Sequence, residues 1–107
     1  MLNPIFVAID TPDLGAARKL ANNLSGHIGG IKVGLEFFCA NGVAGVLELT
    51  QLGMPIFLDL KFHDIPTTVY KACLSALSLD IWMLNIHLSG GLNMALQASK
   101  AKQDSQS

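Results

Sequence analysis

Residues 59–68, DLKFHDIPTT, combine charged side chains with the end of an apolar run that has strand length. Residues two apart in a strand share one face, so Asp59 and Lys61 are expected to lie side by side as an ion pair. Two buried charges are costly unless they pair well, and apolar residues usually serve stability equally well. A fixed ammonium can stabilise developing negative charge and deliver a proton. The pair therefore predicts a catalytic site.

Polar residues also lie at or near the ends of three other apolar runs. The four runs cover residues 4–10 (PIFVAID), 30–34 (GIKVG), 55–61 (PIFLDLK) and 82–87 (WMLNIH), and they start 25 to 27 positions apart. Their nearly continuous apolar character predicts strands of a parallel sheet that are buried on both faces. Asp10, Lys32, Asp59 and Lys61 are then expected to converge at the carboxyl ends of these strands.

The segments between the runs have helical patterns. Thr11, Pro12 and Asp13 offer an N-cap, a proline at the first helical position and an acid in the first turn. An apolar stripe follows, formed by Leu14, Ala17, Ala21 and Leu24. Further helices are predicted over 35–52, 67–79 and 92–101; the first of these is interrupted at Asn41-Gly42 and stopped by Gly53. Residues 102–107 form a polar tail that is expected to fray.

Fourfold alternation of strand and helix indicates an α/β protein with right-handed crossovers. An open doubly wound sheet usually has a glycine-rich turn after its first strand, and Asp10-Thr11-Pro12-Asp13 is not such a turn. Polar residues at several strand ends are instead typical of a (β/α)8 barrel, whose active site lies at that rim. We therefore expect residues 1–101 to form a partial barrel of four β/α units, because a complete barrel needs about twice this length.

Composition narrows the class of partner. Seven basic and eight acidic residues give a net charge of −1. This balance provides neither a basic stripe for nucleic acid nor a polybasic segment for membranes, so a small-molecule ligand is expected. The sequence shows no charged-then-apolar leader and no apolar run of spanning length, which predicts a cytoplasmic protein. Cys39 and Cys73 lack metal-binding spacing and are expected to be buried free thiols.

Several motifs, taken in order, resemble the orotidine 5′-phosphate decarboxylase family over roughly residues 3–100. They are Ala8-Ile9-Asp10, Lys32-Val33-Gly34, Asp59-x-Lys61-x-x-Asp64 with Ile65-Pro66-x-Thr68, and His87-Leu88-Ser89-Gly90-Gly91. Thr67 and Leu88 depart from the usual residues, which are asparagine and a small residue. The resemblance implies the N-terminal (β/α)4 half of a TIM (β/α)8 barrel of the ribulose-phosphate-binding type.

The resemblance also implies an activity, the decarboxylation of orotidine 5′-monophosphate to UMP in pyrimidine biosynthesis, without metal or cofactor. Lys61 would stabilise the carbanion and protonate it, and Asp59 would face the substrate carboxylate. Lys32 would keep Asp59 charged and, with Asp10, bind the ribose hydroxyls. Asp64 and Thr68 would reach the partner's site in a homodimer.

The resemblance places the phosphate grip after the seventh and eighth strands, which lie beyond this sequence. A truncated chain, inactive alone, is therefore expected. Two alternatives stay open: a sugar-phosphate decarboxylase or aldolase of the same suprafamily, which would bind magnesium, and a non-catalytic half-barrel that associates with itself. His63 is expected to be a packing or surface residue, and His87 to have a structural or supporting hydrogen-bonding role.

Overall fold

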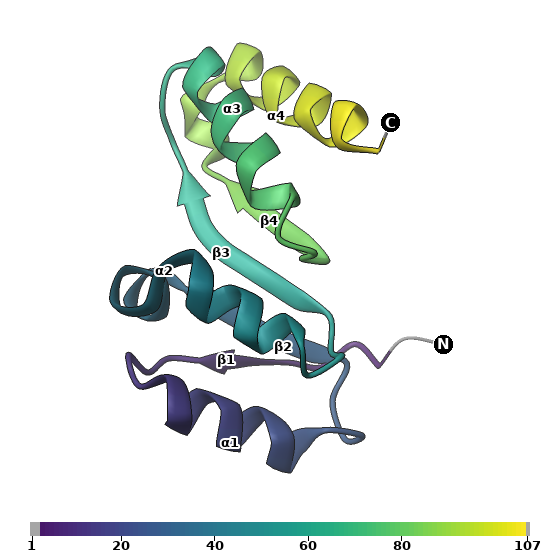
Figure 1. The fold of residues 1–107 in the computed structure, drawn as a ribbon. Helices are drawn as coiled ribbons and strands as arrows, with labels where there is room; N and C mark the ends of the chain where they lie inside the picture. The colour runs from purple at the N-terminus through teal and green to yellow at the C-terminus, as the bar shows by residue number, and fades with distance from the viewer. Residues whose placement is uncertain (1–2, 107) are drawn as a thin grey trace.

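The computed structural model describes residues 3–106 as four strands that alternate with helices (Figure 1). Residues 1, 2 and 107, at the ends of the predicted domain and tail, lie outside the described residues. The elements are β1 (Phe6–Ile9), α1 (Leu14–Leu24), β2 (Gly30–Gly34), α2 (Leu35–Thr50), β3 (Ile56–Phe62), α3 (Pro66–Leu77), β4 (Met83–Ile86), the short 3-10 helix η1 (Leu88–Gly90) and α4 (Leu92–Ser105). Among residues 3–106, no helix is long and apolar enough to cross a membrane.

The four strands form one parallel sheet in the order β1-β2-β3-β4. Ile9 of β1 pairs with Val33 of β2, and Val33 in turn pairs with Leu58 of β3. Each strand therefore pairs with the next strand along the chain, as in the front half of a (β/α)8 barrel. The predicted parallel strands and the predicted half-barrel are confirmed.

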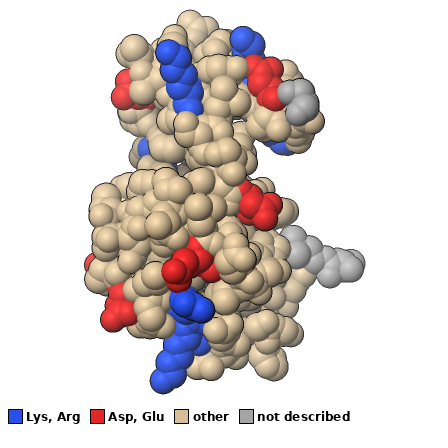
Figure 2. Space-filling view, in the orientation of Figure 1, with Lys and Arg blue, Asp and Glu red and all other residues tan. Residues whose placement is uncertain are grey.

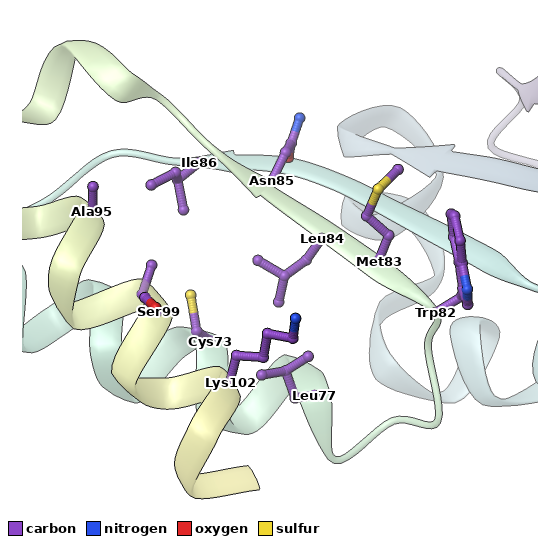
Figure 3. A pocket seen from close by; sticks show the side chains of 11 residues that line it. Cys73, Leu77, Trp82, Met83, Leu84, Asn85, Ile86, Ala95, Ser99 and Lys102 are labelled. Atoms are coloured by element: carbon purple, nitrogen blue, oxygen red, sulfur yellow. The ribbon is translucent and has the colours of Figure 1, made fainter. Parts of the chain in front are cut away.

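The two faces of the sheet differ, because side chains alternate along each strand. One face carries Ile9, Val33 and Leu58, which are buried against the helices. Figure 3 shows that Leu84 of β4 points toward α3 and α4, while Met83 and Asn85 point to the other side. We call this second side the inner face. It carries Ala8, Lys32, Gly34, Phe57, Asp59, Met83 and Asn85.

At the amino end of the inner face, two aromatic rings stack. The ring of Phe6 lies so close over Gly30 that a Cβ on this glycine would meet a ring carbon at 2.5 Å. The same ring stacks on Trp82, with the ring centroids 5.1 Å apart. The charged residues Asp59 and Lys61 lie toward the opposite, carboxyl end of β3.

The core has two parts, which correspond to the two lobes that Figures 1 and 2 show. The first lies mainly among α1, α2 and the first three strands and also includes Ala76 of α3, and the second packs α3 against α4 around Val69, Cys73, Met94 and Ala101. Cys73 is buried as predicted, whereas Cys39 is exposed, so the prediction of buried thiols is wrong for Cys39. β3 runs from one lobe to the other (Figure 1), and Phe62 contacts both clusters. The prediction that all four strands are buried on both faces is wrong. Residues of β1 and β4 are mostly half-exposed, and on the inner face of β2 and β3 the side chains of Lys32 and Phe57 are half-exposed as well.

The start of α1 differs from the prediction. Asp13, rather than Thr11, is the N-cap, and its carboxylate accepts a hydrogen bond from the backbone N–H of Ala16 at 2.9 Å. Pro12 therefore precedes the helix instead of opening it. Thr11 accepts a bond from the backbone N–H of Asp13 at 3.2 Å. Asp13 is favoured because its carboxylate also complements the positive end of the helix dipole.

The predicted interruption of the second helix is confirmed at Gly42. This glycine has φ 64° and ψ −161°, a conformation that divides α2 into two helical pieces. The side-chain amide of Asn41 donates to the carbonyl of Phe37 at 3.1 Å and to that of Pro12 at 2.9 Å. The second bond ties the kink to the loop between β1 and α1.

The last helix is longer than predicted. α4 continues to Ser105, so most of the segment expected to be a frayed tail, residues 102–107, is helical. Tyr70 of α3 donates a short hydrogen bond to Asp104, and the Lys100 ammonium lies 5.1 Å from the centroid of the Tyr70 ring. These contacts with α3 stabilise the end of a helix whose own sequence is merely polar.

Candidate active site

A cluster of three charges and one amide occupies the carboxyl end of the inner face. Lys32 comes from β2, Asp59 and Lys61 from β3, and Asn85 from β4. Gly34 of β2 pairs with Asp59 of β3 at this level of the sheet. The cluster is therefore built from three adjacent strands, and its position follows from their parallel register.

Asp59 is the centre of the cluster and only 5% exposed. Its Oδ1 accepts hydrogen bonds from Lys61 Nζ at 2.8 Å and from Asn85 Nδ2 at 2.7 Å. Its Oδ2 forms an ion pair with Lys32 Nζ at 3.2 Å. The predicted ion pair between Asp59 and Lys61 is thus present, and Lys32 lies on the same rim as expected.

These contacts fix the charge of Asp59. Burial by itself would raise the pKa of the carboxyl group, but the hydrogen bonds from Lys61, Asn85 and Lys32 outweigh burial and lower the pKa from 3.8 to about 2. The group is consequently an anion throughout the neutral range. The two lysines around it are more open to solvent, with side-chain exposures of 32% for Lys32 and 51% for Lys61.

Lys61 has an unusual backbone conformation, with φ 53°. A left-handed conformation costs a residue other than glycine about 1 kcal/mol. Lys61 lies where the pairing of β3 with β4 is irregular, between the partners Leu58–Leu84 and Phe62–Ile86. Its backbone N–H donates to the side-chain oxygen of Asn85 at 2.9 Å. Such bulges re-aim side chains at active sites.

The remaining predicted site residues do not join this cluster directly. Asp10 is exposed and follows Ile9 at the carboxyl end of β1, so it lies on the same rim. Within residues 3–106, no hydrogen bond or ion pair links Asp10 to Asp59 or the lysines. Its role in ribose binding stays a prediction.

Asp64 and Thr68 are exposed beyond the end of β3. The Asp64 carboxylate accepts a hydrogen bond from the backbone N–H of Ile65 at 2.7 Å. Both residues line a cavity of about 230 Å³, which also borders Lys61 and His63. This cavity connects them spatially with the charge cluster. A larger cavity of about 640 Å³ lies between β4 and α4 (Figure 3) and is mostly apolar.

The two histidines near the rim contact each other. The rings of His63 and His87 are tilted by 39° with centroids 5.4 Å apart, and both residues are exposed. The backbone N–H of His87 donates to the carbonyl of Phe62 at 2.9 Å. This bond continues the β3–β4 pairing past the bulge, and the role of the His87 side chain stays a prediction.

Asn85 was not predicted as a site residue. The signal available in the sequence was its polarity within the apolar stretch MLNI, two positions before His87. A polar side chain in such a strand needs a hydrogen-bonding partner, and alternation places it on the face opposite that of Leu84. Its partners on β3 could be identified only from the structure.

The cluster can hold a fixed cation next to a fixed anion. With two ammonium groups and one carboxylate, it carries one positive charge in excess, which suits an anionic ligand. The solvent-exposed Lys61 ammonium can stabilise negative charge at a reacting atom and can donate a proton to it. Among residues 3–106, no three His, Cys, Asp or Glu side chains form a group that could hold a metal ion.

Comparison with known proteins gives the family. Residues 3–106 match the family described as Orotidine 5'-phosphate decarboxylase / HUMPS. The chain belongs to this family. It is 54% identical over 101 residues to the Orotidine 5'-phosphate decarboxylase of Sphingopyxis alaskensis, covering 94% of this chain and 45% of that protein. It is 53% identical over 96 residues to the Ehrlichia canis protein of the same name, covering 90% and 42% respectively.

A solved structure agrees with this assignment. The crystal structure of Orotidine 5'-phosphate decarboxylase from Lactobacillus acidophilus superposes with a TM-score of 0.87 at 36% identity, over 96% of this chain and 46% of that one. The resemblance inferred from the motifs is confirmed, as is the half-barrel fold. The chain spans about half the length of the curated relatives it matches.

Proposed function

We propose that this chain supplies the catalytic charge cluster for decarboxylation of orotidine 5′-monophosphate to UMP, acting in the cytoplasm. The observation that carries the proposal is the buried Asp59 carboxylate held between two ammonium groups, at 2.8 Å from Lys61 Nζ and 3.2 Å from Lys32 Nζ. The cluster lies at the carboxyl ends of parallel strands, where barrel enzymes bind their substrates. Family membership supports the choice of reaction.

Lys61 is the group proposed to act on the reacting carbon. Loss of CO2 leaves a carbanion on the pyrimidine ring with little resonance stabilisation, so a fixed positive charge is needed there. The Lys61 ammonium provides this charge and then transfers a proton to the carbon. The new carbon–hydrogen bond takes the electron pair that the departing CO2 leaves behind. This chemistry requires neither a metal nor an organic cofactor.

Asp59 and Lys32 are proposed to orient this ammonium. Asp59, with its pKa of about 2, stays ionised and holds Lys61 from one side. It would lie against the substrate carboxylate, and Lys32 would keep it charged. Lys32 and the exposed Asp10 are proposed to bind the ribose hydroxyls, since both lie on the rim of the inner face.

Asp64 and Thr68 are proposed to serve the site of a second copy in a homodimer. Both are exposed, and the neighbouring Ile65 is 66% exposed, which supports contact with another molecule. In that arrangement the carboxylate of Asp64 would balance the excess positive charge of the partner's cluster. The apolar Ile65 would add buried area to the subunit contact.

The other half of the relatives is proposed to supply the phosphate grip and the remaining strands of the barrel. Remote binding energy from a phosphate lowers the barrier as well as the dissociation constant, so this chain alone should lose rate. Its exposed apolar residues, among them Trp82 at 52% and Leu88 at 75%, favour self-association until a second half covers them.

A chimera tests the proposal. Residues 3–106 replace the matching segment of the Sphingopyxis alaskensis protein, and decarboxylation of orotidine 5′-monophosphate is followed at steady state. We expect turnover on the order of 10 per second from the chimera. The 107-residue chain alone should give undetectable or very low turnover. Lys61→Ala should abolish turnover, whereas Lys19→Ala, which removes an exposed lysine of α1, should leave it unchanged.

Four outcomes would contradict the proposal. A folded chimera without activity would remove the cluster from this reaction, and near-normal turnover by the Lys61→Ala chimera would remove Lys61 from its role. An isolated chain that turns over substrate at an ordinary rate as a monodisperse monomer would show that the second half is not required. Turnover that stops on magnesium chelation would instead favour a sugar-phosphate enzyme of the same suprafamily.

A further inference from the structure

One side chain connects the two reactive residues of β3. Asn85 is half-buried in β4 and points to the inner face, away from α3 and α4 (Figure 3). Its Nδ2 donates to Asp59 Oδ1 at 2.7 Å, and its Oδ1 accepts from the backbone N–H of Lys61 at 2.9 Å. A single amide thus bonds the carboxylate of one residue and the main chain of the other.

The bond from the Lys61 N–H to Asn85 stands where the backbone hydrogen bonding between β3 and β4 is interrupted. Between Leu58 and Phe62, β3 advances farther than β4 does between Leu84 and Ile86, so the backbone ladder is interrupted. The Lys61 N–H lies within this interruption, where it finds the Asn85 side chain instead of a β4 carbonyl. The bond stabilises a left-handed backbone conformation that is otherwise unfavourable for lysine.

We propose that Asn85 is a positioning residue, which holds Asp59 and the bulged Lys61 in the relative geometry that the reaction needs. The proposal rests on the function proposed above. Asn85 acts through its two neighbours and is not assigned a contact with the reacting atoms. Its amide sets the position of Asp59 from one side and the direction of Lys61 from the other.

The chemistry of the two bonds explains why an asparagine is required. An aspartate could still accept from the Lys61 N–H, but it would bring a second carboxylate next to Asp59 and could not donate to it. A leucine has nearly the same size and can make neither bond. A reversed amide would place its oxygen against the Asp59 carboxylate and its NH2 group against the Lys61 N–H, so only one orientation satisfies both neighbours.

Two variants of the 107-residue chain distinguish the two bonds. Asn85→Leu removes both of them, and Asn85→Asp removes only the bond to Asp59. Asn23→Leu and Asn23→Asp, at an exposed position of α1, are the matched controls. NMR titration of the Asp59 carboxyl carbon measures its pKa, and hydrogen exchange of the Lys61 amide reports the bulge. We expect both Asn85 variants to raise the Asp59 pKa, Asn85→Leu by about 1 and Asn85→Asp by more, because it adds like-charge repulsion. The Lys61 amide should exchange faster in Asn85→Leu but not in Asn85→Asp.

The same variants in the chimera test the catalytic consequence. We expect kcat to fall about 10- to 100-fold, the range for losing a hydrogen bond to a charged group, while KM stays nearly constant. Unchanged Asp59 pKa and Lys61 exchange in both Asn85 variants would overturn the proposal, and so would unchanged kcat. If Asn85→Leu does not fold, the nearly isosteric Asn85→Asp decides through the Asp59 pKa and kcat. An inactive parent chimera would refute the proposed function alone, because the NMR measurements do not depend on turnover.

Discussion

The charge cluster predicts a specific dependence of stability on pH. The pKa of Asp59 is 3.8 when unperturbed and about 2 in the folded chain. This difference corresponds to about 2 kcal/mol of folding free energy, at 1.36 kcal/mol per pKa unit. Because the folded-state pKa is the lower one, the stabilisation is present above the unfolded-state pKa of 3.8 and is progressively lost as the pH falls toward 2. Asp59→Asn removes the titrating group and with it this part of the pH dependence.

Urea unfolding from pH 7 down to pH 2 measures the effect. We expect the free energy of unfolding of the parent, minus that of Asp59→Asn, to be constant above about pH 5 and to decrease by about 2 kcal/mol at the acid end. Glu48→Gln is the control. Glu48 also forms an ion pair, with Arg18 at 3.2 Å, but both side chains are about half exposed. Exposed pairs contribute roughly 0 to 1 kcal/mol, so its difference curve should be nearly flat.

A difference between the parent and Asp59→Asn that does not change with pH would refute this reasoning. It would mean that Asp59 titrates alike in the folded and unfolded chains, and that the two lysines and Asn85 do not hold it as an anion. An increase in the difference toward low pH would reverse the sign and indicate that burial outweighs the hydrogen bonds.

Two further predictions concern backbone conformation and helix length. Lys61→Gly should be more stable than Lys61→Ala by about 1 kcal/mol in urea unfolding, because both variants lose the ammonium and only alanine retains the cost of φ 53°; equal stabilities would argue against the left-handed conformation. Tyr70→Phe should speed amide exchange over residues 102–105 by removing the bond to Asp104, with α1 as the internal reference; unchanged exchange would show that the helix end does not depend on α3.

The strands were predictable because they repeat. Four apolar runs at nearly constant spacing leave room for one helix each, and parallel pairing follows from that spacing. The ends of the helices were harder to predict from the sequence. Asp13 replaced Thr11 as N-cap because both residue types are good caps, and their relative fit depends on how the chain leaves β1. The extension of α4 depends on Tyr70, a residue far away in the sequence that no local pattern connects with Asp104.

Within the site, too, local sequence patterns were predictive, whereas contacts between different strands were not. Alternation along a strand placed Asp59 beside Lys61, and the common rim brought Lys32 to them. Neither rule could predict that Lys61 lies in a bulge, since strict alternation assumes a regular strand. The bulge depends on how β3 pairs with β4, and the residue that stabilises it, Asn85, belongs to the neighbouring strand. Sequence patterns describe each strand singly, whereas this part of the site is a property of the pair.

The cluster itself explains how a four-strand sheet can carry reactive groups in defined positions. All four members come from three consecutive strands, and Asp59 has a partner on each side of it. A buried carboxylate without these partners would be protonated or would destabilise the sheet. With them, the anion stabilises the two lysines that surround it and leaves one positive charge in excess. The excess charge is the part of the cluster that a bound anion would complete.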